Sequence, residues 1–356
     1  MGGAASGHGY LLLEDGTVFP GRSVAAAGSA FGEAVFTTGM TGYQETVTDP
    51  SYAEQLVCFT APMVGNYGVD DTRLESEATH ARAVVMRRLG GEEWALWLAE
   101  QGVVALDEVD TRALTLRLRE SGAMRAVAVS DEQTVAVEDA LADVRAQPLM
   151  EGAALVAQVS TPAPYVAEPQ GDVRVALVDY GAKRSIVRRL ARAGAAVTVF
   201  PSVSDPDELA GYDGVLLSNG PGDPAPLVEE TEVVRSLLGR VPVLGICLGH
   251  QLLGLATGHE TLKLPFGHRG ANHPVLDRRT GRVLVTSQNH GFAVAAAETD
   301  DATHVSLYDG TIEGFDFPEL RAASVQFHPE AGPGPHDAWP VLERWVEGLR
   351  EAPDAG

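Results

Sequence analysis

One stretch of the sequence joins a short apolar run to a helix-like segment through a single cysteine. Residues 240–246 are typical of a short buried strand, and residues 248–256 are typical of a helix. Cys247 stands between them, with a glycine two positions away on each side. A residue on such a sharp strand-to-helix turn stands clear of the sheet, and the glycines leave room beside it. The stretch therefore predicts a sheet whose strands run directly into helices.

The rest of the second half repeats this alternation, so residues 172–356 predict one α/β domain. The expected strands are residues 173–178, 196–200, 214–217 and 241–246, and the expected helices are residues 183–193 and 227–238. Strands that are apolar throughout and alternate with helices indicate a mostly parallel central sheet covered on both faces. Ligands of such sheets bind at the carboxyl ends of the strands. Residues 260–325 are strand-rich.

The first part of the chain has a different pattern, which indicates a separate α+β domain over residues 1–160. The expected strands are residues 10–13, 18–19, 56–60, 83–86 and 123–129, and the expected helices are residues 92–101, 111–120 and 131–145. Residues 161–171 hold three prolines and no periodic pattern, which is typical of a linker between domains.

Composition excludes several classes of protein. A length of 356 residues suits two domains, and the net charge of −23 argues against a nucleic-acid partner, which requires a basic face. The only two cysteines, Cys58 and Cys247, favour a reducing compartment, so we expect a cytoplasmic protein. No apolar run approaches the roughly 20 residues that span a bilayer, so no membrane association is expected.

Cys247 is the first candidate for chemistry. The turn places its sulfur at a helix N-terminus, where the helix dipole favours the nucleophilic thiolate. His328 and Glu330 follow a predicted strand over residues 322–326 and share one face, since alternate residues of an extended chain do so. The order Cys…His-x-Glu supplies a nucleophile, an imidazole that activates it and a carboxylate that orients the imidazole.

Two further segments surround this set. Residues 218–224 follow a strand end, and their two glycines about a proline could expose amide groups to an oxyanion together with the Leu248 amide. Residues 287–292 fit either a hairpin turn or a substrate wall that offers backbone groups. Five histidines between residues 250 and 290 match no zinc spacing, so no metal is expected, and no phosphate-binding motif indicates a nucleotide.

At this point the motifs resemble a known family. GICLGHQ at 245–251, preceded by NGPGDP at 219–224 and followed by FHPE at 327–330, resembles the class I (triad) glutamine amidotransferases. The first domain resembles the small subunit of carbamoyl phosphate synthetase, through TGMTGYQETVTDPSY at 38–52. The segments FGHRGANHP at 266–274 and HPEAGPGPHD at 328–337 agree with it.

The resemblance implies a glutaminase subunit that passes ammonia to a large subunit. By resemblance, Cys247 is the nucleophile, His328 the general base and acid, and Glu330 its orienting partner. The implied glutamine contacts are Ser51, Gly220, Gly222, Leu248, Gln251, Asn289, Gly291 and Phe292. No cofactor is expected in this chain, whereas ATP and Mg are expected in the large subunit, which makes carbamoyl phosphate from bicarbonate for arginine or pyrimidine biosynthesis. A higher-order assembly of heterodimers is expected.

Two alternatives stay open from the residues alone. The first is another Cys-His-Glu hydrolase, such as a glutaminase for a different synthetase or a cysteine peptidase, against which the 38–52 motif argues. The second is a non-catalytic scaffold subunit, against which the intact Cys247, His328 and Glu330 argue. An unusually reactive thiol would distinguish an active site from a dead one.

Overall fold

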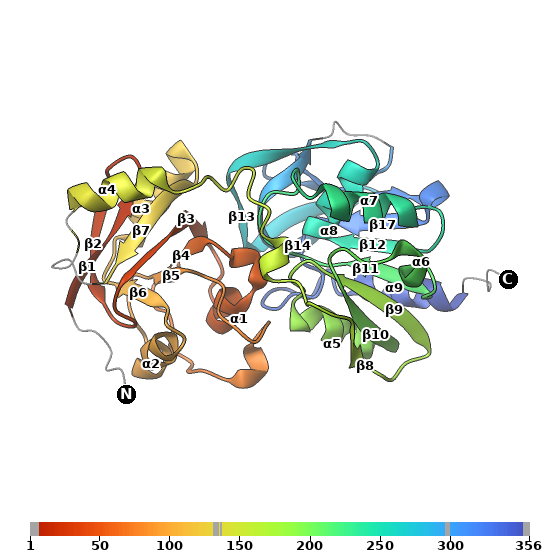
Figure 1. Cartoon of the computed structure of the whole chain (residues 1–356), viewed down its shortest axis with the longest axis horizontal. Coiled ribbons are helices and arrows are strands. Elements are labelled where there is room, and N and C mark those ends of the chain that lie inside the picture. The colour runs from red at the N-terminus through yellow and green to blue at the C-terminus, as the bar shows by residue number, and fades with distance from the viewer. Residues whose placement is uncertain (1–6, 131–134, 136, 296–299, 352–356) are drawn as a thin grey trace. The chain divides into compact units, whose positions relative to one another are not determined.

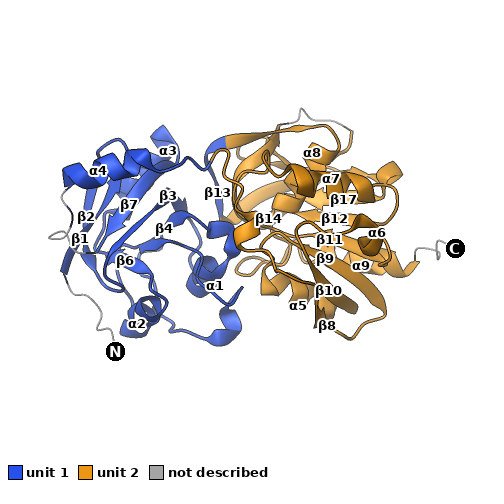
Figure 2. Ribbon diagram, in the orientation of Figure 1, with its two compact units in different colours: residues 1–150, 264–269 blue, residues 151–263, 270–356 orange. Residues whose placement is uncertain are grey.

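The computed structural model describes residues 7–130, 135, 137–295 and 300–351 of the chain. The chain divides into two compact units, residues 1–150 with 264–269 and residues 151–263 with 270–356 (Figure 2).

Residues 151–160 were expected to end the first domain, but they belong to the second unit. They pack within the second unit because the backbone N–H of Gly152 donates to the Asp223 carboxylate at 2.8 Å, and Asp223 N–H donates to the Ala153 carbonyl at 3.0 Å. The expected linker also contains a strand, β8 (Tyr165–Glu168), which pairs with a neighbouring strand of the second unit. Its prolines lie outside the paired residues, which is why composition alone missed the strand.

The first unit is built around a closed seven-stranded barrel in the order β1-β2-β6-β5-β4-β3-β7 (Figure 1). The strands are β1 (Gly7–Leu13), β2 (Val18–Ser23), β3 (Ser29–Thr37), β4 (Gln55–Phe59), β5 (Ala83–Val85), β6 (Val104–Asp107) and β7 (Met124–Val129). The predicted hairpin at the start of the chain is confirmed, since Leu12 pairs with Val18. Strands β3 and β6 and the closure of the barrel were not predicted, because closure depends on pairings between distant segments.

The helices of the first unit are α1 (Tyr43–Thr48), α2 (Glu92–Glu100), α3 (Thr111–Ser121) and α4 (Val137–Ala146). Helix α3 is capped by Asp110, whose carboxylate accepts from the Ala113 N–H, and is followed by Gly122 with a φ of 91°. These bounds confirm two predicted helices to within one residue. The predicted helix over 131–145 begins instead at Val137 among the described residues, and residues 131–134 and 136 lie outside them.

The second unit contains a ten-stranded sheet in the order β14-β13-β15-β16-β17-β12-β11-β9-β10-β8. Its parallel part consists of β9 (Val173–Asp179), β10 (Ala195–Pro201), β11 (Gly214–Leu217), β12 (Val243–Ile246) and β17 (Ala322–Val325). The other strands are β8, which pairs antiparallel with β10, and β13 (Glu260–Asp277), β14 (Arg282–Ala295), β15 (Ala302–Ser306) and β16 (Ile312–Phe317). The pairs β13 with β15, β15 with β16 and β16 with β17 are antiparallel. The mostly parallel sheet and the strand-rich segment are thus both confirmed.

Two hydrophobic cores cover the two faces of the parallel strands. On β9, Ala176 and Val178 pack with α7 (Val228–Leu237) and α8 (Leu248–Ala256), whereas Val175 and Leu177 pack on the other face. That second face is covered by α5 (Arg184–Arg192) and α9 (Pro340–Glu351). Burial on both faces explains why these strands read as continuous apolar runs.

Residues 287–292 lie inside strand β14, so their interpretation as a hairpin turn was wrong; β14 is polar there because its side chains face a buried polar network instead of an apolar core. No helix in the described ranges combines the length and the apolar character needed to cross a membrane.

Candidate active site

The candidate site residues follow four neighbouring parallel strands at their carboxyl ends. Lys183 follows β9, Gly220 follows β11, Cys247 follows β12 and His328 follows β17. Hydrogen-bonded pairing of β9 with β11, β11 with β12 and β12 with β17 brings these ends to one edge of the sheet. This is the edge at which open α/β sheets bind ligands.

Cys247 occupies the single residue between β12 and α8. Its φ of 53° and ψ of −103° lie in a region that side chains rarely adopt, and its N–H donates to the Val325 carbonyl at 2.9 Å. The neighbouring glycine is required, because a Cβ on Gly249 would lie 2.3 Å from the Leu217 carbonyl oxygen. The local packing therefore holds the strained turn, and the cysteine side chain is 2% exposed.

His328 and Glu330 are joined by a short hydrogen bond. Nδ1 of His328 lies 2.7 Å from Oε1 of Glu330, and both side chains are almost fully buried. Lys183 is the third member of this chain of contacts, since its Nζ lies 2.5 Å from the same carboxylate oxygen. The backbone N–H of His328 donates to the Ser287 carbonyl at 2.9 Å, which ties the histidine to β14.

These charges set the protonation of the pair. Burial and the Lys183 ammonium lower the pKa of His328, but Glu330 and Cys247 raise it, and the net pKa is about 10 against an ordinary value of 6.5. Burial raises the pKa of Glu330, but Lys183 and His328 outweigh it and lower that pKa to about 2. Near pH 7 the site therefore holds an imidazolium beside a carboxylate.

These shifts predict how stability depends on pH. The stabilisation from Glu330 is fully present above its ordinary pKa of 4.5 and is lost as the pH falls to about 2. The stabilisation from His328 is fully present below pH 6.5 and is lost as the pH rises through about 10. We expect the unfolding free energy, measured by denaturant titration, to fall on both sides of this plateau. In Glu330→Gln the acidic decline should shrink, and an unchanged curve would contradict the assigned pair.

The loop after β11 lies beside the cysteine turn. A Cβ on Gly220 would lie 2.2 Å from the Tyr180 carbonyl oxygen and 2.7 Å from Cδ2 of Leu248. Asn219 anchors the loop, because its Nδ2 donates to the Gly181 carbonyl at 2.9 Å and its Oδ1 accepts from the Lys183 N–H at 3.2 Å. Gly222 has a φ of 90°, which favours glycine. The loop is thus a tightly fitted backbone surface.

The close packing of Gly220 against Tyr180 and Leu248 predicts the effect of adding a methyl group there. Gly220→Ala should lower the unfolding free energy by about 1–3 kcal/mol, because the backbone must shift to admit the methyl group, and it should lower the activity of the Cys247 site. Gly348→Ala is the matched control, since it lies in helix α9 with no atom within 4 Å of the added Cβ. Equal behaviour of the two variants in thermal unfolding and activity would refute the close packing.

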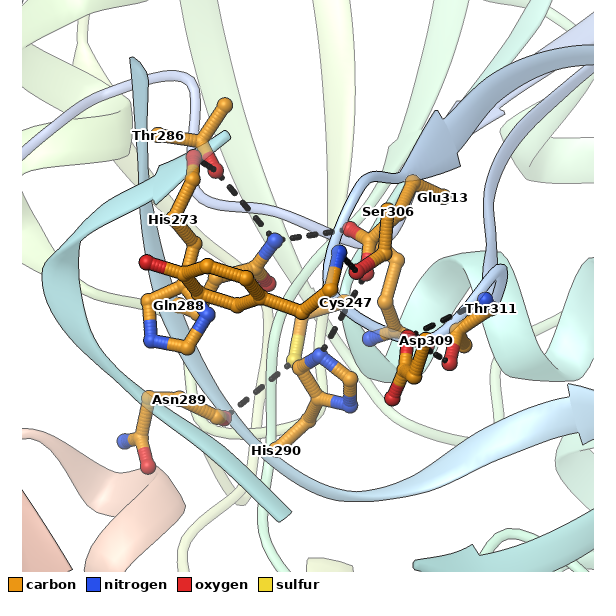
Figure 3. Close-up of polar contacts among 12 residues, drawn as sticks. Cys247, His273, Thr286, Gln288, Asn289, His290, Ser306, Asp309, Thr311 and Glu313 are labelled. Atoms are coloured by element: carbon orange, nitrogen blue, oxygen red, sulfur yellow. Dashed lines mark hydrogen bonds and ion pairs between the residues drawn. The ribbon is translucent and has the colours of Figure 1, made fainter. Parts of the chain in front are cut away.

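Strand β14 also contacts the turn that holds Cys247. Sγ of Cys247 donates to the Asn289 carbonyl at 3.6 Å, while Gln288 and His290 turn toward the buried Glu313 (Figure 3). Nε2 of His328 is buried and has no nitrogen or oxygen partner among the described residues, and Cys247 lies close enough to raise the pKa of His328.

The predicted glutamine contacts divide between the units. In the second unit, Gly220, Gly222, Leu248, Gln251, Asn289, Gly291 and Phe292 lie on the loop after β11, on α8 or on β14. Nε2 of Gln251 donates to the Phe292 carbonyl at 2.8 Å, which joins α8 to β14. Ser51 belongs to the first unit, in a 3₁₀ turn (Pro50–Tyr52), where its N–H donates to the Asp49 carboxylate at 2.9 Å.

Sequence reasoning missed Lys183 as a site residue. It was assigned to the start of the helix over 183–193, yet its side chain is 4% exposed and paired with Glu330. The available signal was its position just after an apolar strand next to the strand that leads into NGPGDP. A lysine at the carboxyl end of a buried parallel strand faces the ligand edge of the sheet.

Comparisons with known proteins agree with both halves of the chain. The family model described as glutamine amidotransferase class-I matches residues 176–346. The model described as carbamoyl-phosphate synthase small chain, CPSase domain, matches residues 11–128.

Several relatives match along nearly the whole chain. The carbamoyl phosphate synthase small chain of Parasynechococcus marenigrum is 44% identical, with 99% of each chain covered. That of Streptomyces avermitilis is 46% identical, with 97% of this chain and 96% of the relative covered. That of Bacillus caldolyticus is 41% identical, with 96% of each covered. The chain therefore belongs to the carbamoyl phosphate synthase small chain family and carries a class-I glutamine amidotransferase domain.

Proposed function

We propose that this chain is the glutaminase subunit of a carbamoyl phosphate synthase. It hydrolyses glutamine to glutamate and ammonia at Cys247 and delivers the ammonia to a large subunit. The observation that carries the proposal is the Cys247, His328 and Glu330 set at the ends of two hydrogen-bonded parallel strands, in a chain matched over its full length by small chains.

The turn at Cys247 serves as a nucleophile elbow. Cys247 reacts as the thiolate, with the proton held on the His328 imidazolium. The thiolate attacks the carboxamide carbon of glutamine, the C=O electrons move to oxygen, and a tetrahedral oxyanion forms. The N–H of Leu248 has no partner inside its helix because α8 begins there. This N–H and the amides of the loop after β11 would donate hydrogen bonds to the oxyanion.

His328 then transfers protons in both halves of the reaction. Its imidazolium protonates the departing nitrogen as the C–N bond breaks, which releases ammonia and leaves a thioester on Cys247. The neutral imidazole next removes a proton from water, which attacks the thioester. The C–S bond then breaks, glutamate leaves, and the thiolate beside the imidazolium is restored. Glu330 keeps the imidazole oriented through Nδ1, so that Nε2 points to the reacting atoms.

Glutamine binding is assigned to the backbone and side chains around this point. In the second unit, the contacts are Gly220, Gly222, Leu248, Gln251, Asn289, Gly291 and Phe292. Ser51 stays a prediction that rests on the resemblance of the motif at 38–52. Neither a metal nor a cofactor takes part in this half of the reaction.

The partner is a carbamoyl phosphate synthase large subunit. It would use ATP, Mg and bicarbonate to convert the ammonia to carbamoyl phosphate for arginine or pyrimidine biosynthesis, and the heterodimers would assemble further. An internal transfer of ammonia suits this division, because free ammonia is protonated in water and ammonium is not a nucleophile. The cytoplasm suits a chain with only two cysteines, both free.

Reconstitution with a candidate large subunit tests the proposal. Carbamoyl phosphate formation is measured with glutamine and, separately, with ammonium salts as the nitrogen source. We expect the large subunit alone to use only ammonia, and the mixture to use glutamine as well. If this chain releases ammonia from glutamine but supports no synthesis with that subunit, the glutaminase stands and the assigned partner is wrong.

A further inference from the structure

The amide of Gln251 is fixed by two acceptors. It lies in the first turn and a half of α8, four residues after Cys247, which precedes that helix. Its Nε2 donates to the Phe292 carbonyl at 2.8 Å and to Oε1 of Gln326 at 3.1 Å. An amide nitrogen has two hydrogens, and both are therefore used.

The side-chain oxygen of Gln251, Oε1, is the free end of the amide. Among the described residues, no donor is bonded to its Oε1, which retains its acceptor capacity. The Phe292 carbonyl also accepts from Nδ1 of His290 at 2.8 Å, so two donors occupy that oxygen. Of the two acceptors of the Gln251 amide, one is a backbone carbonyl and the other is the side chain of Gln326. Substitution can therefore remove only the Gln326 acceptor.

Gln326 is well placed to act on Gln251 and on little else. Its side chain is fully buried, and it lies between strand β17 and His328. Its backbone N–H donates to the Glu313 carbonyl at 2.8 Å, and its side-chain Nε2 has no hydrogen bond among the described residues. A buried amide that uses only its oxygen is unusual, because an unsatisfied N–H is costly.

We propose that Gln326 is a positioning residue that sets which end of the Gln251 amide meets the substrate. By accepting from Nε2, it holds the Gln251 oxygen as the free end, so that Gln251 binds an N–H donor of glutamine. Without Gln326, the Phe292 carbonyl, which also accepts from His290, is the one remaining acceptor for Nε2 among the described residues. The amide can then rotate and present its NH₂ group to those donors unproductively. The inference rests on the proposed glutaminase function and concerns the same site.

Substitutions at position 326 separate the acceptor from the rest of the side chain. Gln326→Met keeps the size and removes the acceptor, and we expect KM for glutamine to rise about tenfold with kcat changed much less. Gln326→Glu is the matched variant, because burial favours its neutral carboxyl. In that form it keeps the acceptor oxygen and loses an NH₂ group that bonds to nothing in the described part of the chain. It should retain a KM within about threefold of the parent, since no hydrogen bond is lost.

A double-mutant cycle supplies the readout that a merely structural role would not change. In a Gln251→Met background, Gln326→Met should raise KM no further, since the group on which it acts is gone. Full additivity of the two effects, or an unchanged KM in Gln326→Met, would overturn the proposal. Thermal unfolding of each full-length variant shows whether a loss of folding accounts for a change.

Glutamine binding to the Cys247→Ser protein, measured by calorimetry, separates the two levels of the argument. If this protein with Gln326 intact shows no glutamine binding, the proposed function fails. If it binds glutamine and the added Gln326→Met weakens Kd about tenfold, the positioning role is supported. If it binds glutamine equally with and without Gln326, the positioning role alone is wrong.

Discussion

Cys247→Ser is expected to reduce glutamine-dependent activity by at least about 10⁴-fold, because the hydroxyl cannot replace the thiolate as nucleophile. In the complex with a large subunit, ammonia-dependent synthesis should stay at the level of the parent protein. The measurement compares the two nitrogen sources in one preparation. Persistent use of glutamine by the variant would contradict the covalent mechanism.

The second cysteine offers a matched control. Cys58 lies on β4 in the core of the barrel, is 2% exposed, and has its pKa raised to about 12 by burial, which keeps the thiol protonated. Cys58→Ala should leave glutamine use unchanged. A loss of activity in this variant equal to that in Cys247→Ser would show that folding, and not chemistry, had been tested.

Lys183→Met is expected to lower the unfolding free energy by about 3–5 kcal/mol. The substitution removes the ammonium 2.5 Å from Glu330 and leaves a buried carboxylate with only His328 as its partner. Because Lys183 lowers the pKa of His328, the pKa of His328 should rise further in the variant. Denaturant titration measures the first effect, and NMR titration of the imidazole measures the second.

Lys183→Arg keeps the positive charge and serves as the control for this prediction. We expect it to recover most of the stability and to keep the His328 pKa near that of the parent, although its larger head group is a poorer fit. A His328 pKa that stays the same or falls in Lys183→Met would show that the ammonium does not act on the imidazole.

Local patterns accounted for the elements that carry the nucleophile. The helix over 248–256 matches α8 to the residue, and the strand over 241–246 corresponds to β12, which begins two residues later at Val243. The strand over 214–217 also matches β11 to the residue. The pairing of His328 with Glu330 also followed from a spacing of two residues after a strand.

Non-local pairings explain what the sequence did not reveal. The barrel closes where β1 pairs with β7, more than a hundred residues apart, and no local pattern encodes such a contact. Strand β8 is an exposed edge strand between prolines, so it lacked the apolar character of the buried strands. Lys183 meets Glu330 only because β9 and β17 lie in the same sheet, separated by β11 and β12.

Affinity labelling with a chloroketone analogue of glutamine tests the central claim most directly. A thiolate that is bound beside the analogue displaces its chloride, and peptide mapping of the labelled full-length chain locates the new thioether bond. The account predicts stoichiometric labelling of Cys247, prevented by excess glutamine, with Cys58 unlabelled. Labelling at another residue, or labelling of Cys247 that glutamine does not slow, would contradict it.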